Sequence, residues 1–206
     1  MPEQPGSMDP WGTSCTAVIY TAVCDTIVNE PMTWITSNTF EVVSLSGVES
    51  WEQISANTWN FTLRQGVKFH NGEPWNAESA KAGIDQNGNV DNASSSYSYH
   101  GSVQGEVVDE YTVRVVCADD CAVLPRSMIF GRFQAPGWYA SAPEEELNRQ
   151  VHGIGPYKLV EWRPDIDIQM EIYEDYVPNP NNIQTCLLYT SPSPRDRTRS
   201  RMPSSA

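Results

Sequence analysis

The chain has 206 residues, a formal net charge of -13 at pH 7 and a hydrophobic content of 39%. This length and apolar content predict a folded protein of one or two domains, and they exclude a disordered chain. The acidic excess disfavours nucleic-acid partners, which bind mainly through Lys and Arg. No apolar run is long enough to predict a membrane span, and no secretory signal stands at Met1.

The N-terminal part predicts a turn, a helix and a strand. Gly6–Pro10 has turn composition, and residues 14–26 mix small and apolar side chains in a way that favours a helix. We expect this helix to lead into a strand around Val23–Val28.

A hairpin and a helix start are predicted between Trp59 and Glu78. Trp59, Phe61 and Leu63 alternate with polar residues, the pattern of a half-buried strand. Gln65-Gly66 then turns the chain into a second short strand over 67–69. Asn71-Gly72 predicts a tight turn, because both residues tolerate positive φ. Asn76 can cap a helix over 77–87.

The middle of the chain is predicted as loop, strand and helix. Residues 87–105 are rich in Gly, Asn, Ser and Tyr and predict a loop. Glu106–Cys117 alternates and predicts one strand. Residues 121–134 favour a helix despite Pro125.

A second turn-and-strand unit is predicted near the C-terminal end. Pro143–Leu147 favours a loop that enters a helix. Gly153-Ile154-Gly155-Pro156 predicts a sharp turn into a strand. Residues 166–172 alternate as a further strand, with isoleucine or methionine at every second position.

Two of these segments resemble the signatures of family 5 extracytoplasmic solute-binding proteins, the peptide- and nickel-type receptors of ABC importers. Trp59–Glu78 is similar to W-T-F-x-L-R-x-G-V-K-F-H-D-G-x-P-F-x-A-E-D, with Asn71 in place of Asp. Gly153–Trp162 is similar to G-T-G-P-Y-x-L-x-x-W, with Ile154 in place of Thr. The resemblance covers about residues 5–178. Its signature residues are Trp59, Phe61, Leu63, Arg64, Gly66, Phe69, Gly72, Gly153, Gly155, Pro156 and Tyr157. We expect the aromatic and aliphatic ones, together with Val67, Trp75 and Trp162, to form core.

The resemblance implies an α/β fold of the two-lobed, type II periplasmic-binding-protein kind. Residues 1–185 would hold only the first lobe and its accessory portion. It further implies capture of a peptide or similar solute outside the membrane, for delivery to an ABC permease. The expected receptor is a monomer in the periplasm or on the outer face of the cytoplasmic membrane, with no cofactor and no catalytic group. A nickel, metallophore or oligosaccharide receptor of the same family is the alternative.

An enzyme is the alternative from another class. A small acidic secreted hydrolase would need a spaced carboxylate pair, and the sequence offers none. His70, His100 and His152 are scattered without metal-binding spacing, so structural or surface roles are expected for them.

Ligand contacts are expected on inner faces of the lobes. By position against the family pattern, Gln4 and Pro5 border the cleft. Tyr97, Tyr99 and His100 fall in an aromatic segment that flanks the ligand. Aromatic side chains there would offer apolar area with a polar tip.

The cysteines leave two interpretations open. Cys117 and Cys121 can close a small disulfide loop around Asp119-Asp120, or they can remain thiols together with Cys15 and Cys24. A metal site is disfavoured, because the spacing is C-x3-C with no second pair and no nearby histidine.

We expect residues 186–206 not to belong to the natural protein sequence. Cys186–Asp196 can be encoded by a transposase-type sequencing adapter, and Ser200–Ala206 by the flow-cell end of the same adapter, in one reading frame. The residues between them leave room for an index. We therefore expect a gene fragment that ends in a translated adapter.

Overall fold

The computed structural model describes residues 7–12, 28–92, 96–164 and 166–177. The helix predicted over 14–26, most of the strand that follows it, Cys15, Cys24 and the segment 186–206 lie outside these ranges.

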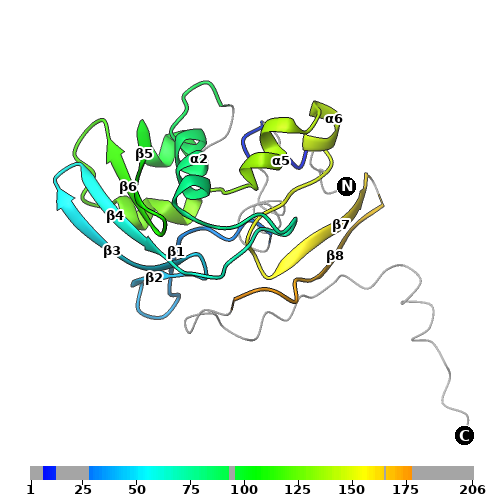
Figure 1. The fold of residues 1–206 in the computed structure, drawn as a ribbon, viewed down its shortest axis with the longest axis horizontal. Helices are drawn as coiled ribbons and strands as arrows, with labels where there is room; N and C mark the ends of the chain where they lie inside the picture. Colours follow the sequence, from blue (N-terminus) through cyan, green and yellow to red (C-terminus); the bar gives the residue numbers. More distant parts are fainter. Residues whose placement is uncertain (1–6, 13–27, 93–95, 165, 178–206) are drawn as a thin grey trace, which may run out of the picture.

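The largest unit is a four-stranded antiparallel sheet of order β3-β4-β6-β5. Its strands are β3 (Val48–Ser55), β4 (Thr58–Leu63), β5 (Val103–Asp109) and β6 (Thr112–Cys117). Helix α2 (Ala77–Asn87) covers one face of this sheet, over β5 and β6 (Figure 1). The sheet and helix enclose the main core.

The predicted alternation in β4 is confirmed. Trp59, Phe61 and Leu63 are buried, and the residues between them are partly exposed. Phe61 lies opposite Val113 of β6, which is also fully buried. On the outer face Arg114 Nε donates to Asn60 Oδ1 at 3.1 Å. The sheet is therefore apolar toward α2 and polar on its other side.

Two predictions for the middle of the chain are wrong. Residues 106–117 form parts of two strands, because Asp109 Oδ1 accepts a hydrogen bond from Tyr111 N at 2.9 Å and the chain reverses there. The predicted loop 87–105 contains helix α3 (Ser96–His100) and the start of β5. Val103 pairs with Cys117, so cross-strand pairing outweighs the local Gly and Ser composition.

The signature hairpin contains both predicted turns. Gly66 and Gly72 adopt φ values of 80° and 90°, which side chains other than glycine rarely tolerate. Asn71, which precedes Gly72 in the second turn, does not itself adopt a positive φ. Its Oδ1 accepts from Glu73 N at 3.1 Å instead. The expected second strand over 67–69 is reduced to a single bridge between Lys68 and Pro74.

Helix α2 has the predicted bounds and the predicted cap. Asn76 Oδ1 accepts from Ser79 N at 3.0 Å, and Ser79 Oγ accepts from Asn76 N at 2.9 Å. These two bonds satisfy backbone donors that have no partner within the helix, a contribution of about 1 kcal/mol.

The helix predicted over 121–134 is shorter than expected. It comprises α4 (Leu124–Ser127) and the 3-10 turn η2 (Met128–Phe130). The chain becomes extended at Gly131, with φ -68° and ψ 136°. Helix α5 (Pro136–Ser141) was not predicted, whereas α6 (Glu144–Leu147) was. The carboxylate of Glu73 caps α5, accepting from Gly137 N at 2.8 Å and from Trp138 N at 2.9 Å.

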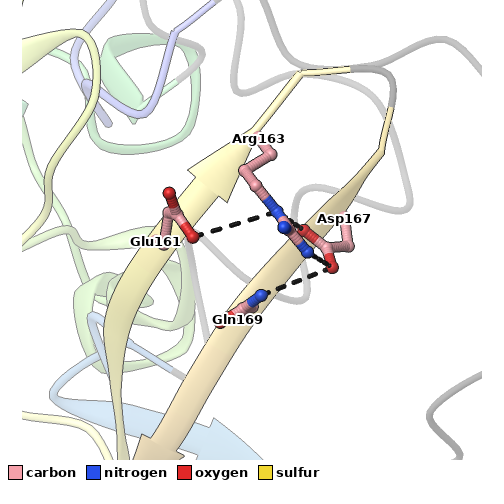
Figure 2. A network of polar contacts seen from close by, with 4 residues as sticks. All are labelled: Glu161, Arg163, Asp167 and Gln169. Atoms are coloured by element: carbon pink, nitrogen blue, oxygen red, sulfur yellow. Dashed lines mark hydrogen bonds and ion pairs between the residues drawn. The ribbon is translucent and has the colours of Figure 1, made fainter.

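Two further hairpins complete the described fold. β1 (Thr33–Ile35) pairs with β2 (Val42–Ser44), and β7 (Tyr157–Arg163) pairs with β8 (Asp167–Ile172). Figure 2 shows that Arg163 reaches across the second hairpin to Asp167, with Glu161 and Gln169 beside it. The strands predicted from Gly153–Pro156 and from 166–172 are thus confirmed, although Ile166 and Ile172 are 71% and 68% exposed.

The signature side chains lie mainly in the core, as expected. Trp59, Phe61, Leu63, Val67, Phe69 and Trp75 belong to the main cluster. Trp162 belongs to a second cluster beneath β7 and β8, with Met8, Val28, Val151 and Leu159. Tyr157 is only half-buried.

Candidate functional site

An aromatic pair marks the surface at the junction of α3 and η2. The rings of Tyr99 and Phe130 stack with centroids 3.7 Å apart and planes 15° apart. Tyr99 is 49% exposed, although it is a large aromatic residue. Part of Tyr99, an aromatic side chain with a polar tip, is therefore open to solvent beside Phe130.

His100 lies next to this pair and is buried. Its Nδ1 is 3.2 Å from Ser127 Oγ, and this hydroxyl donates to Leu124 O at 3.0 Å. Because the hydroxyl proton is used, Nδ1 is the protonated ring nitrogen. Burial lowers the pKa of His100 to about 4, so the imidazole is neutral near pH 7.

Arg132 lies two residues beyond Phe130 and is 2% exposed. Its Nη1 donates to Pro10 O, and its backbone N and O both bond to the side chain of Asn87, at 3.2 and 3.0 Å. Trp11 Nε1 also donates to Asn87 Oδ1, at 3.1 Å. Asn87 therefore joins the end of α2 to Trp11 and to the segment after η2.

The charge of Arg132 acts on the groups around it. Burial raises the pKa of Asp9, and the nearby guanidinium opposes this shift. The same guanidinium adds to the lowering of the His100 pKa. The cluster thus combines a fixed buried positive charge, a neutral histidine and an exposed aromatic pair. We call Tyr99, His100, Phe130 and Arg132 the aromatic–arginine site.

Two of the five predicted ligand residues meet in this site. Tyr99 and His100 lie in it, with His100 buried rather than projecting. Gln4, Pro5 and the side chain of Tyr97 lie outside what the structure describes. Sequence reasoning missed Phe130 and Arg132, because only the packing of η2 against α3 brings them to this place.

The two signature motifs are joined to each other. His70 N donates to Gly153 O at 3.0 Å, and His70 Nε2 lies 2.8 Å from Gly155 O. A carbonyl can only accept, so Nε2 carries the ring proton. Burial lowers the pKa of His70 to about 4. The contacts of His70 are therefore those of a structural residue. Beside it, the Tyr173 hydroxyl donates to Phe69 O at 3.0 Å and ties the end of β8 to the first motif.

The structure also pairs Cys117 with Cys121 in a disulfide, with Cα atoms 6.4 Å apart. Trp59 Nε1 donates to Cys121 O at 3.0 Å, so the closed loop packs on the neighbouring strand. Within the described ranges no group of three or more His, Cys, Asp or Glu side chains could hold a metal ion. No helix in the same ranges is long and apolar enough to span a bilayer.

The chain matches a sequence family and several known proteins. Residues 45–200 match "Bacterial extracellular solute-binding proteins, family 5 Middle". The glutathione-binding protein GsiB of Salmonella typhi is 30% identical over 126 residues, which cover 58% of this chain and 24% of GsiB. The chain therefore spans about a quarter of the length of this relative.

Solved structures show the same fold at lower identity. A dipeptide binding protein from Pseudoalteromonas sp. SM9913, in complex with Met-Leu, superposes with a TM-score of 0.71 at 20% identity, over 85% of this chain and 39% of that chain. NikZ from Campylobacter jejuni, in complex with Ni(L-His), gives a TM-score of 0.71 at 17% identity, over 84% of this chain and 34% of that chain.

These likenesses confirm the expected fold class, part of a type II periplasmic binding protein with mixed α and β structure. The match to the family covers more than half of the sequence. The chain belongs to the bacterial extracellular solute-binding proteins of family 5.

Proposed function

We propose that this chain is part of the substrate-binding component of an ABC importer, which captures a peptide or similar solute outside the membrane. Its membership of the solute-binding family carries this proposal. The receptor would act in the periplasm or on the outer face of the cytoplasmic membrane, as a monomer that docks on a permease complex.

The aromatic–arginine site supports a solute that carries a carboxylate and an apolar group. The Tyr99–Phe130 pair offers a ring surface, and the positive charge of Arg132 lies close enough to act on the neighbouring His100. The compounds named for the relatives fit this chemistry, since Met-Leu, L-histidine and glutathione all carry carboxylates. Arg132 is buried, so it would act through the field of its charge.

The solute would be captured by closure of two lobes around it. A ligand that contacts both lobes only in the closed state shifts the population toward closure. No bond would be made or broken. The described residues supply one wall of such a site, and the residues that select among solutes would come in part from the second lobe.

A binding panel on the full-length gene product tests this proposal. We expect calorimetry to detect a dipeptide or a tripeptide such as glutathione, and Tyr99→Ala to weaken that binding about tenfold through loss of ring contact. Tyr99→Phe keeps the ring and should bind like the wild type. Unchanged affinity in Tyr99→Ala would remove Tyr99 from the site.

The same panel separates the alternatives. Ni²⁺ with histidine, and an oligosaccharide, represent the nickel, metallophore and sugar receptors. Binding of one of these alone would favour that class over peptides. Hydrolysis of a panel compound would instead support the secreted hydrolase.

We also propose that residues 1–185 are the N-terminal part of a longer family 5 protein, and that residues 186–206 are a translated sequencing adapter. The division is supported because codons for Cys186–Asp196 and Ser200–Ala206 can be read from an adapter sequence. The family match argues against the division, because it extends through residue 200. Long-read resequencing of the locus should show different codons after residue 185, and native codons through residue 206 would refute the division.

A further inference from the structure

A buried carboxylate at Glu30 lies where three separate stretches of the chain meet. Glu30 is 2% exposed, and its backbone φ of 29° lies in a region that side chains other than glycine rarely adopt. Its Oε2 accepts from Ser46 Oγ at 2.5 Å, and its Oε1 accepts from Ser46 N at 3.2 Å. The surrounding fold therefore holds both the backbone and the side chain of Glu30 in place.

The third bond to Glu30 comes from the far end of the described chain. Tyr176 Oη donates to Glu30 Oε1 at 3.0 Å, across 146 residues of sequence. Tyr176 lies in the turn after β8, where its N donates to Tyr173 O at 3.1 Å. Val177 packs on the main core directly afterwards. Glu30 thus fastens the segment Tyr173–Val177 to the interior.

Few charges offset the buried carboxylate. Arg64 faces it from the end of β4, but the guanidinium is engaged with backbone carbonyls, Nε to Ser46 O at 3.0 Å and Nη2 to Val48 O at 3.3 Å. From the C-terminal segment the facing titratable group is the Tyr176 hydroxyl. The 45–47 segment contributes only Ser46, whose hydroxyl and backbone N–H carry no charge. Burial is the dominant influence and raises the pKa of Glu30 to about 7, although the hydrogen bonds from Ser46 and Tyr176 and the charge of Arg64 oppose this shift.

We propose that Glu30, Ser46 and Tyr176 form an acid-stabilised latch, which holds the segment Tyr173–Val177 on the fold when Glu30 is protonated and loosens when it ionises. A neutral carboxyl needs little hydration, and it can keep its partners if its own proton is donated to Ser46 Oγ while Oε1 still accepts from Ser46 N and Tyr176 Oη. An ionised carboxylate in the same place is poorly solvated, so opening that admits water becomes more favourable.

The direction and range follow from proton linkage. The closed latch has the raised pKa of about 7, and an opened latch in which water surrounds Glu30 would return it to the ordinary carboxyl value of 4.5. The closed state therefore binds the proton more tightly, and its stabilisation is complete well below pH 4.5. Opening becomes more favourable as the pH rises through 4.5 toward 7, by about 300-fold in total, and levels off above about pH 8.

Hydrogen exchange read by mass spectrometry tests the latch on the full chain. After correction for intrinsic exchange rates, protection of amides in 173–177 should fall by about 100-fold between pH 4.5 and 7.5. Glu30→Gln should remove this pH dependence, because the amide cannot ionise. Glu174→Gln removes an exposed carboxylate in the same segment and should behave like the wild type.

Two measurements test the latch even if Glu30→Gln fails to fold: one on a second variant and one on the wild type. Ser46→Ala removes a hydrogen bond that favours the ionised form, so the pH-dependent range should extend above pH 7. Wild-type protection in 173–177 that stays constant across this pH range would overturn the latch. The same pH dependence in Glu30→Gln as in the wild type would also overturn it.

Discussion

Replacing Gly153 with alanine should destabilise the protein by about 3 kcal/mol or more. A Cβ on Gly153 would lie 2.1 Å from Val28 O and 2.5 Å from Asn29 Cα. Both are backbone atoms of a buried segment, so neither can move aside as the end of a flexible side chain could. Urea unfolding followed by tryptophan fluorescence should show a lower midpoint at an unchanged slope.

Gly66→Ala is the matched control for Gly153→Ala. Gly66 has a φ of 80°, but a Cβ on this residue would meet no heavy atom within 4 Å, so its replacement tests backbone conformation without a clash. We expect a loss of about 1 kcal/mol there. Equal losses in the two variants would show that the contact with Val28 does not determine the need for glycine at 153.

Replacing Trp75 with alanine should cost about 4 kcal/mol. Trp75 is 1% exposed, and its ring meets Phe69 and Phe133 edge to face at 5.7 and 5.2 Å. Its Nε1 donates to Gly47 O at 2.7 Å, so truncation leaves both a cavity and a buried carbonyl without its donor. The loss should appear in chemical unfolding as a reduced free energy of unfolding.

Two comparisons separate the contributions at Trp75. Trp75→Phe keeps ring contacts but loses the donor, and it should lose less than the alanine variant. Trp34→Ala removes an indole that is 41% exposed and should change stability far less. A small effect of Trp75→Ala, similar to that of Trp34→Ala, would contradict the central packing position of this side chain.

Local signals predicted the elements that depend on neighbouring residues. The alternation around Phe61 and the cap at Asn76 act over a few positions, and both appear as expected. The break at Asp109 was missed because alternation continues on both sides of it, and only the bond to Tyr111 N reveals the turn. Val103 was assigned to a loop because its pairing with Cys117 is not visible in local composition.

The candidate site was predictable only through resemblance. Tyr99 and His100 were expected from their place in the family pattern, and the structure brings them together with Phe130 and Arg132. Those two residues carry no local signal. Their place depends on Asn87, which holds the backbone of Arg132 from the end of another helix.

The cap that Glu73 places on α5 has a consequence for the order of folding. Glu73 reaches Gly137 across 64 residues, and His70 reaches Gly155 across 85. By contrast, β3 and β4 are joined by a short turn and can pair early, because little chain must be closed into a loop. The contacts of Glu73 and His70 require long loops to close, so they should form late. Docking of the signature hairpin onto residues 135–155 should therefore limit the folding rate of this part of the chain.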